Sequence, residues 1–225
     1  ITNAKKRSLI EKTTAQSTLN QPPLNSPFPG LSDRSPRWRQ IATLYSSSWN
    51  PVSNPVGITL SILFALLVYF LSRYSVMGNS NESVLLYLLH QTNLVFHEAG
   101  HIIFGIFGRV ISILGGSLGQ LMILLLVSGH FWYKRDAAGF AFGSFWFFEN
   151  FLDVAHYMAD ARALILPLIG GLGPEAHDWR NLFMEWGVLR HDTQIASWVN
   201  TLGWIGMLWT WLWLIRRWIS DRKKT

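Results

Sequence analysis

The chain has 225 residues, no cysteine, 49% hydrophobic side chains, 14% charged ones and a formal net charge of +6. Without cysteine it has no disulfide framework, thiolate metal site or thiol nucleophile. Its basic residues gather at the two ends rather than over one folded face, which argues against a nucleic-acid-binding domain. These features favour an integral membrane protein whose first partner is the lipid bilayer and which has no nucleic-acid partner.

Residues 1–55 form a basic, proline-rich N-terminal extension. This segment contains seven of the nine prolines and seven Lys and Arg against two Asp and Glu, so it carries five of the six net charges. Its 16 hydrophobic side chains are too few to offset the entropy lost on ordering such a segment. We expect it to be an exposed cytoplasmic tail or, alternatively, a segment that lies across partner subunits of a larger assembly.

Residues 56–225 are expected to form an all-α, polytopic bundle of transmembrane helices. A membrane helix needs about 20 mostly apolar residues, and five segments are long enough. They are 56–74, 84–108, 110–132, 137–160 and 195–219. Between the last two, residues 163–173 are apolar but too short to span, and residues 178–189 have the pattern of an amphipathic helix at the membrane surface.

The distribution of positive charge places both ends of the chain in the cytoplasm. Basic residues number seven before the first span and five at or after the end of the last, whereas the connections between spans hold one, one, two and three. Both ends on one side require an even number of spans, but five segments qualify. The sequence therefore leaves the topology open at four to six spans.

The second predicted span contains His97-Glu98-Ala99-Gly100-His101, which matches the H-E-x-x-H pattern. On a helix, two histidines four residues apart share a face and can bind one Zn²⁺ through their ring nitrogens. The glutamate between them lies beside the metal and can accept a proton from water. Ionisable groups at membrane depth are costly unless they have a function or a partner. His97 and His101 are therefore predicted zinc ligands, and Glu98 is the predicted catalytic base.

A catalytic zinc site needs a third protein ligand. The fourth predicted span carries a stripe of four ionisable residues at helical spacing: Glu149, Asp153, His156 and Asp160. Asp160 and Asp153 are the best candidates for the third ligand, and His156 is expected to orient a carboxylate or a metal-bound water. Two alternatives stay open. In the first, the stripe is an acidic edge of the protein that pairs with Arg162. In the second, the two histidines are hydrogen-bonded core residues, or they form a metal site without hydrolysis.

The segment His177-Asp178-Trp179 opens the predicted amphipathic helix. A His-Asp pair at a helix start can cap the helix, which is the favoured interpretation. The alternative is a gate or an additional ligand near the metal. Elsewhere, Gly115 and Gly119 have the G-x-x-x-G spacing that lets two helices approach closely.

These residues resemble the site-2-protease class of intramembrane zinc metalloproteases, the M50-like family. The resemblance is closest to a group of uncharacterised bacterial integral membrane proteins with an H-E-x-x-H motif, and it covers about residues 90–195. The matching pieces are FHEAGHIIFGIFG, LGGSLGQL, NFLDVAHYMADAR, LPLIGG and HDW. The resemblance implies that His97 and His101 bind zinc, that Glu98 is the base, and that Asp160, within YMADAR, is the third ligand.

Site-2 proteases usually carry their ligand Asp in an L-D-G element preceded by Asn-Pro. Residues 150–154, NFLDV, retain the Asn and the Leu-Asp but lack the Pro and the Gly, so Asp153 stays a rival to Asp160. The resemblance implies a multi-pass protein of the bacterial inner membrane that hydrolyses a peptide bond of a membrane substrate. The alternative is a non-catalytic accessory subunit of a large membrane complex, which retains the zincin-like scaffold and contacts neighbouring membrane subunits.

Overall fold

The structure is a computed structural model that describes residues 48–73, 84–168 and 171–223. Within these ranges the regular secondary structure is helical, apart from one isolated β-bridge between Asn50 and Asp136. The all-α expectation is therefore confirmed. Residues 1–47 of the predicted extension lie outside the described residues, so both interpretations of that extension stay predictions.

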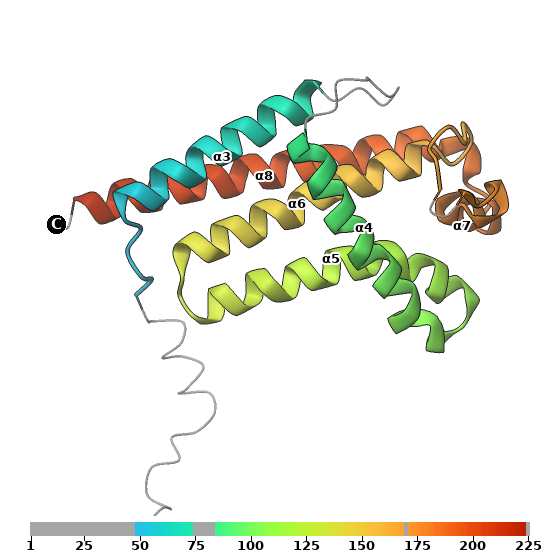
Figure 1. Cartoon of the computed structure of the whole chain (residues 1–225), viewed down its shortest axis with the longest axis horizontal. Helices are drawn as coiled ribbons and strands as arrows, with labels where there is room; N and C mark the ends of the chain where they lie inside the picture. Colours follow the sequence, from blue (N-terminus) through green and yellow to red (C-terminus); the bar gives the residue numbers. More distant parts are fainter. Residues whose placement is uncertain (1–47, 74–83, 169–170, 224–225) are drawn as a thin grey trace, which may run out of the picture. The chain divides into compact units, whose positions relative to one another are not determined.

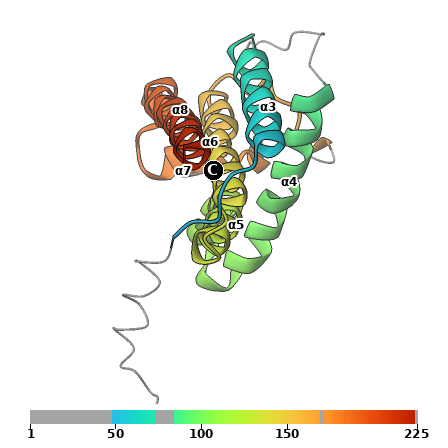
Figure 2. The ribbon, with the colours of Figure 1, turned by 90° about the vertical axis from the view of Figure 1, so that its left-hand side faces the viewer.

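Five long helices make up the described fold (Figure 1). They are α3 (Asn54–Arg73), α4 (Val84–Phe104), α5 (Arg109–Tyr133), α6 (Ala137–Ala159) and α8 (Asp192–Arg222). Each begins and ends within a few residues of one of the five apolar segments in the sequence. A short helix, α7 (Asp178–Glu185), and three 3₁₀ turns connect them: η1 (Gly105–Phe107), η3 (Pro174–Ala176) and η4 (Leu189–His191). In the end-on view of Figure 2, α4 lies on one side of the group and α8 on the other.

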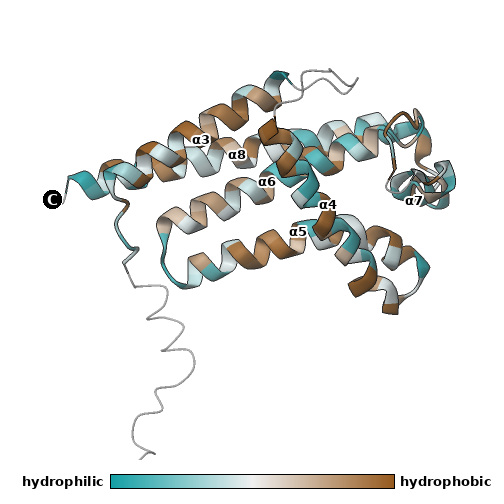
Figure 3. Cartoon of the chain, viewed as in Figure 1, coloured by the Kyte–Doolittle hydropathy of each residue, from teal (hydrophilic) through white to brown (hydrophobic). Residues whose placement is uncertain are grey.

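Two of the described helices, α3 and α5, are long and apolar enough to cross a membrane. The expected bundle of five spans is not supported, because α4, α6 and α8 have the length but not the composition. Figure 3 shows this contrast between the mainly apolar α5 and the hydrophilic turns of α4. Some polar side chains of these helices pack inside the protein: Asn93 of α4 and Asn150 of α6 are fully buried and hydrogen-bonded to each other.

The hydrophobic core has two parts that position the helices around the polar interior. The first joins α3, α6 and α8, where the ring of Phe64 stacks on that of Phe145 with centroids 4.0 Å apart and Met207 is fully buried. The second joins α6 to α7 through Trp179 and Phe183, which are both buried. This second part fixes α7 against the bundle by apolar burial, the main driving force for such docking.

The start of α6 is held by a side-chain cap. The carboxylate of Asp136 accepts hydrogen bonds from the backbone N–H groups of Ala138 (3.1 Å) and Gly139 (3.0 Å). Removing such a cap costs about 0.5–2 kcal/mol of stability. We expect Asp136→Ala to lower the thermal unfolding midpoint, whereas Asp136→Asn, which keeps a side-chain oxygen, should lower it much less. Equal losses for the two variants in a melting experiment would contradict the capping role.

The predicted amphipathic segment 178–189 forms α7, but the helix ends earlier, at Glu185. The cause is Gly187, whose φ of +69° is the left-handed conformation that terminates helices. Its N–H donates to the carbonyl of Met184 (3.1 Å), and the N–H of Val188 donates to that of Phe183 (2.9 Å). These two bonds satisfy the last carbonyls of α7 and turn the chain toward α8. The described part of the other short segment, 163–168, is a loop.

Candidate metal centre

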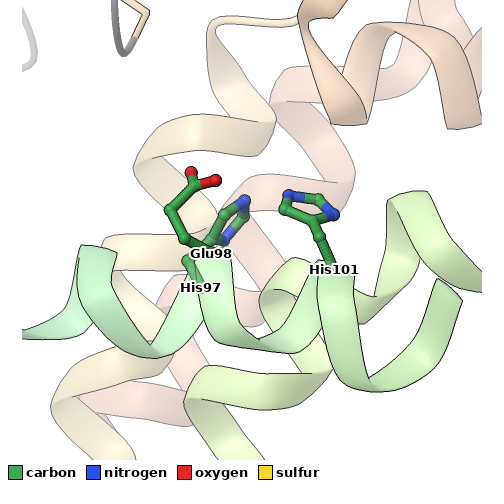
Figure 4. Close-up of side chains that lie close together, drawn as sticks. All are labelled: His97, Glu98 and His101. Carbon is green, nitrogen blue, oxygen red and sulfur yellow. The ribbon is translucent and has the colours of Figure 1, made fainter.

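The H-E-x-x-H motif lies near the end of α4, where its three ionisable side chains gather. One ligand atom from each of His97, Glu98 and His101 lies within 4.8 Å of the other two. Figure 4 shows both rings and the carboxylate on the same side of α4. His97 is buried, His101 is half-buried and Glu98 is exposed. The group can therefore hold a metal ion, with its carboxylate at the side that water reaches.

Both histidine rings are oriented by hydrogen bonds from Nδ1. Nδ1 of His97 lies 2.9 Å from Oε1 of Gln120, and Nδ1 of His101 lies 2.8 Å from the carbonyl oxygen of Ser112. Nε2 of Gln120 donates to Asp153 at 2.8 Å, which leaves its Oε1 as the acceptor facing His97. Because both partner atoms are acceptors, each Nδ1 carries a proton. When Nε2 of such a ring carries no proton, it presents a lone pair, as it does in metal-binding histidines.

A third group, the carboxylate of Asp178, meets both rings. Its Oδ2 lies 2.9 Å from Nε2 of His97 and 3.2 Å from Nε2 of His101. Burial alone would raise the pKa of Asp178, but its hydrogen bonds with His101 and His97 outweigh burial and lower that pKa. The carboxylate is therefore an anion that faces two ring nitrogens. Two lone pairs and an anionic oxygen repel one another unless a cation, either protons or a metal ion, lies among them.

A tetrahedral ion would need slightly more room than these hydrogen-bonded side chains leave. Ligand atoms about 2.0–2.2 Å from zinc at tetrahedral angles lie roughly 3.3–3.6 Å apart, whereas Oδ2 of Asp178 lies 2.9 Å and 3.2 Å from the two Nε2 atoms. Gly116 of α5 lies directly beside the rings. A Cβ atom at this position would touch Nε2 of His97 and lie 2.7 Å from Nε2 of His101. Glycine is thus what leaves room for both rings at this face of α5.

The close approach of α4 to α5 also depends on glycine. A Cβ at Gly119 would lie 2.6 Å from Cα of Gly100, so the two helix backbones touch here. The carbonyl of Gly115 meets Gly100 in the same way. The contact expected from the G-x-x-x-G spacing of Gly115 and Gly119 is therefore present, and it brings Gly116 and Gln120 up to His97.

His177 caps α7, as the sequence favoured. Its Nδ1 accepts a hydrogen bond from the backbone N–H of Arg180 at 3.2 Å. Burial lowers the pKa of His177, which keeps the ring neutral and Nδ1 able to accept. The two residues of the His-Asp pair have different roles: His177 begins the helix, while Asp178 reaches the histidine pair.

Two further hydrogen bonds fix the position of Asp178. Its backbone N–H donates to the hydroxyl oxygen of Tyr157 on α6 at 3.1 Å. The neighbouring indole of Trp179 donates to Oγ of Ser117 on α5, also at 3.1 Å. Asp178 therefore sits on a short helix anchored to both α5 and α6, which makes the carboxylate a fixed part of the site.

Asp160, the ligand expected from the family resemblance, is not brought to the histidine pair. It ends α6, where its carboxylate accepts hydrogen bonds from the backbone N–H groups of Ile165 (2.8 Å) and Leu166 (3.1 Å). Its Oδ2 also lies 3.4 Å from Nε2 of His177. In this structure Asp160 shapes the loop after α6 and supports the residue that caps α7.

Asp153, the other candidate for the third ligand, is separated from the histidine pair by the side chain of Gln120. Its Oδ2 accepts from Gln120, which in turn contacts His97, and its Oδ1 lies 2.7 Å from Nδ1 of His90. Asp153 therefore orients His97 through Gln120. The acidic stripe is not paired with Arg162, whose guanidinium instead bonds the carboxylate of Asp192 at 2.7 Å.

Sequence reasoning assigned no role to Gln120, Ser112 or Gly116. A usable signal existed for two of them, because Gly116 and Gln120 lie one helical turn apart in an otherwise apolar segment. A buried amide in such a segment needs a hydrogen-bond partner, and the histidine pair is a suitable one. Ser112 acts through its backbone carbonyl, for which the sequence offers no signal.

A scan against protein-family models found no match to this chain, and searches of curated proteins and of solved structures found none either. Membership of the M50-like family accordingly stays an expectation drawn from motifs. What the geometry provides is a His-Glu-x-x-His group on a helix that can bind a metal ion.

Proposed function

We propose that this chain is an M50-like zinc metallopeptidase that hydrolyses a peptide bond of a membrane substrate. One observation carries the proposal. Nε2 of His97, Nε2 of His101 and Oδ2 of Asp178 converge on one place, and the carboxylate of Glu98 lies beside it. Two histidines and a carboxylate form a ligand set of catalytic zinc sites, which keep their fourth position open.

In this proposal His97, His101 and Asp178 hold the ion. When bound, Zn²⁺ supplies a Lewis acid that polarises the peptide carbonyl and makes a water molecule easier to deprotonate. Glu98 accepts the proton of the attacking water and delivers it to the leaving amine. Its exposure gives it access to water, while Gln120 and the carbonyl of Ser112 keep the rings in their binding orientation.

The proposal places the reaction at or within the bacterial inner membrane, in a multi-pass protein with a cytoplasmic N-terminus. Support comes from α3 and α5, which are apolar and long enough to cross a bilayer. Asn93 of α4 is buried against Glu149 and Asn150 of α6, as polar side chains at membrane depth must be. The basic residues at both ends of the chain set the orientation.

Glu98→Gln tests the catalytic role. The amide cannot take up the proton, so cleavage should fall about 100- to 10,000-fold, the range typical of general-base catalysis. Zinc content should stay the same, since Glu98 is not among the proposed ligands. The measurement is mass-spectrometric detection of cleavage in a library of membrane-spanning peptides, with purified protein in proteoliposomes. Glu185→Gln, an exposed site at the end of α7, is the matched control. Cleavage by the Glu98→Gln variant at the unsubstituted rate would rule out the assigned role.

A second candidate function, an accessory subunit of a membrane complex, is favoured by the outer face of α8. Five large apolar side chains on it are more than half exposed and recur every three or four residues: Trp198, Leu202, Ile205, Trp209 and Leu212. A stripe of this spacing suits packing against a helix of another subunit. Zinc binding without cleavage of any library member, together with co-purification of fixed membrane partners, would favour this candidate over the enzyme.

A further inference from the structure

The charged side chains of the bundle are divided unequally between its two ends. At one end the start of α3, the turn from α5 to α6 and the end of α8 lie together (Figure 1). The backbone N–H of Asn50 donates to the carbonyl of Arg135 (2.8 Å), and the guanidinium of Arg217 donates to the carbonyl of Trp49 (3.1 Å). These bonds join three segments, which we call the basic end: residues 48–54, 132–136 and 213–223.

The metal centre lies at the opposite end of the bundle. The histidine pair contacts the first turns of α5, where His101 bonds the carbonyl of Ser112. Asp178 lies beside the end of α6, because its N–H donates to the hydroxyl of Tyr157. The loop after α6 is tied to the start of α8 by the ion pair of Arg162 with Asp192 (2.7 Å). The helices α5, α6 and α8 therefore all run between the metal centre and the basic end.

The distance between the two ends is close to the thickness of a membrane. Gly116, which lies beside both histidine rings, precedes Trp132 by 16 residues on α5, and this spacing corresponds to about 24 Å along the helix. The hydrocarbon core of a bilayer is about 30 Å thick, and α5 is long and apolar enough to cross it. With the basic end at one boundary of the hydrocarbon core, the metal centre lies close to the other boundary.

The charge of the basic end suits the cytoplasmic side of a membrane. Its three segments hold six Lys and Arg against two Asp, and the seven basic residues that precede residue 48 join the fold at this same end. Four of the six cations are exposed: Lys134, Arg216, Arg222 and Lys223. Lys and Arg beside a span favour the cytoplasmic side, where anionic lipid headgroups attract them.

Aromatic rings accompany these cations. The three segments contain five Trp and Tyr side chains: Trp49, Trp132, Tyr133, Trp213 and Trp218. The guanidinium carbon of Arg135 lies 4.7 Å from the ring centroid of Trp132 and 5.4 Å from that of Trp49. The guanidinium carbon of Arg222 lies 5.8 Å from the ring centroid of Trp218. Trp and Tyr concentrate at membrane–water interfaces, because their rings are apolar while their N–H and O–H groups are polar. The basic end therefore has both features of a headgroup layer.

The end with the metal centre has the opposite balance of charge. Residues 97–112 and 157–193 hold six Asp and Glu against four Arg. These four basic residues compare with thirteen in the basic end and the residues that precede it. Since the side richer in Lys and Arg stays in the cytoplasm, the end with the metal centre belongs on the other side of the membrane.

We propose that the metal centre opens at the face of the inner membrane that points away from the cytoplasm, while the basic end contacts the anionic headgroups of the cytoplasmic leaflet. This inference rests on the proposed function and names its substrate class. The substrate is a membrane-spanning segment that is cut in the half of its span nearer the outer face. Water reaches the exposed carboxylate of Glu98 from that face.

The test uses the absence of cysteine, because a single introduced thiol then reports its own side of the membrane. Ala163→Cys marks the end with the metal centre and Ser220→Cys marks the basic end, and both positions are exposed. The full chain is expressed in a bacterium, and a membrane-impermeant maleimide is added to spheroplasts. Ala163→Cys should be labelled in intact spheroplasts, whereas Ser220→Cys should be labelled only after the membrane is broken. The unsubstituted chain should take no label, and both variants should be labelled in detergent.

Labelling of Ser220→Cys alone in intact spheroplasts would overturn the proposal, because the metal centre would then face the cytoplasm. Labelling of both variants in intact spheroplasts, or of neither, would overturn it as well, since the two ends would lie on one side. The labelling requires neither zinc nor cleavage, so its result does not depend on the peptidase activity. Cut sites in the cytoplasmic half of the substrate would contradict the proposed substrate class and leave the peptidase function standing.

Discussion

Replacing Asp178 by alanine should remove zinc from the protein and leave its helices folded. The carboxylate of Asp178 is the proposed third ligand and contacts both ring nitrogens of the histidine pair. Residues that merely support a ligand cost about 10- to 100-fold in metal affinity when they are replaced, so loss of a direct ligand should cost more than about 100-fold. Competition with a chelating zinc indicator measures the affinity, and circular dichroism monitors the helices.

Two matched variants separate Asp178 from the carboxylates favoured by the sequence. Asp160→Asn should keep zinc, because Asp160 bonds the backbone of the loop after α6 rather than the histidine pair. Asp153→Asn should weaken zinc binding about 10- to 100-fold, as expected for a group that acts through Gln120. If the Asp160 variant lost its zinc while the Asp178 variant retained it, Asp160 would be the ligand, as the family resemblance implies.

Replacing Gly116 by alanine should also disable the metal centre, although glycine offers no ligand. The added Cβ would touch Nε2 of His97, lie 2.6 Å from its Cε1 and lie 2.7 Å from Nε2 of His101. Both rings would have to rotate, and their Nε2 atoms would leave the place where they converge with Asp178. We expect zinc affinity to fall by at least the roughly 10- to 100-fold seen when ring orientation is lost.

Gly129 provides the control on the same helix. A Cβ at Gly129 has nothing within 4 Å among the described atoms. Gly129→Ala should therefore leave zinc affinity unchanged and stabilise α5 by about 0.5–1 kcal/mol, because alanine loses less backbone entropy in a helix. A Gly116→Ala protein that binds zinc as tightly as the Gly129→Ala protein would show that the rings do not need this space.

The helices were largely predictable from the sequence, because apolar runs of the right length are interrupted by clear stop signals. Gly108, with φ of +96°, separates α4 from α5, and the cap at Asp136 begins α6. The number of apolar spans was not predictable in this way. Asn93 and Asn150 make α4 and α6 less apolar than a lipid-facing helix, and only the packing shows that these side chains satisfy each other.

The part of the site that lies on a single helix was predictable from the sequence. The spacing of His97 and His101 on one helix fixes their common face, and Glu98 follows from the same motif. The third carboxylate depends on the path of the chain after α6. Asp160 ends α6 and Asp178 begins α7, and their places in the sequence do not show which one faces the rings. The structure shows that Asp160 bonds the backbone of Ile165 and Leu166, while Asp178 turns toward the rings. Which carboxylate faces the rings depends on tertiary contacts, and the spacing of residues along a helix does not encode these contacts.

The α4–α5 hairpin has a consequence for the order in which the site forms during folding. Its ring-orienting contacts are short in sequence: His101 bonds a carbonyl 11 residues away, and His97 bonds Gln120, 23 residues away. Asp178 is 81 residues from His97. Contacts of low sequence separation form early, and distant ones must wait for the chain to close longer loops. A growing chain would therefore carry an incomplete histidine pair until α7 docks, and under the proposed function full zinc affinity would arise only in a nearly finished fold.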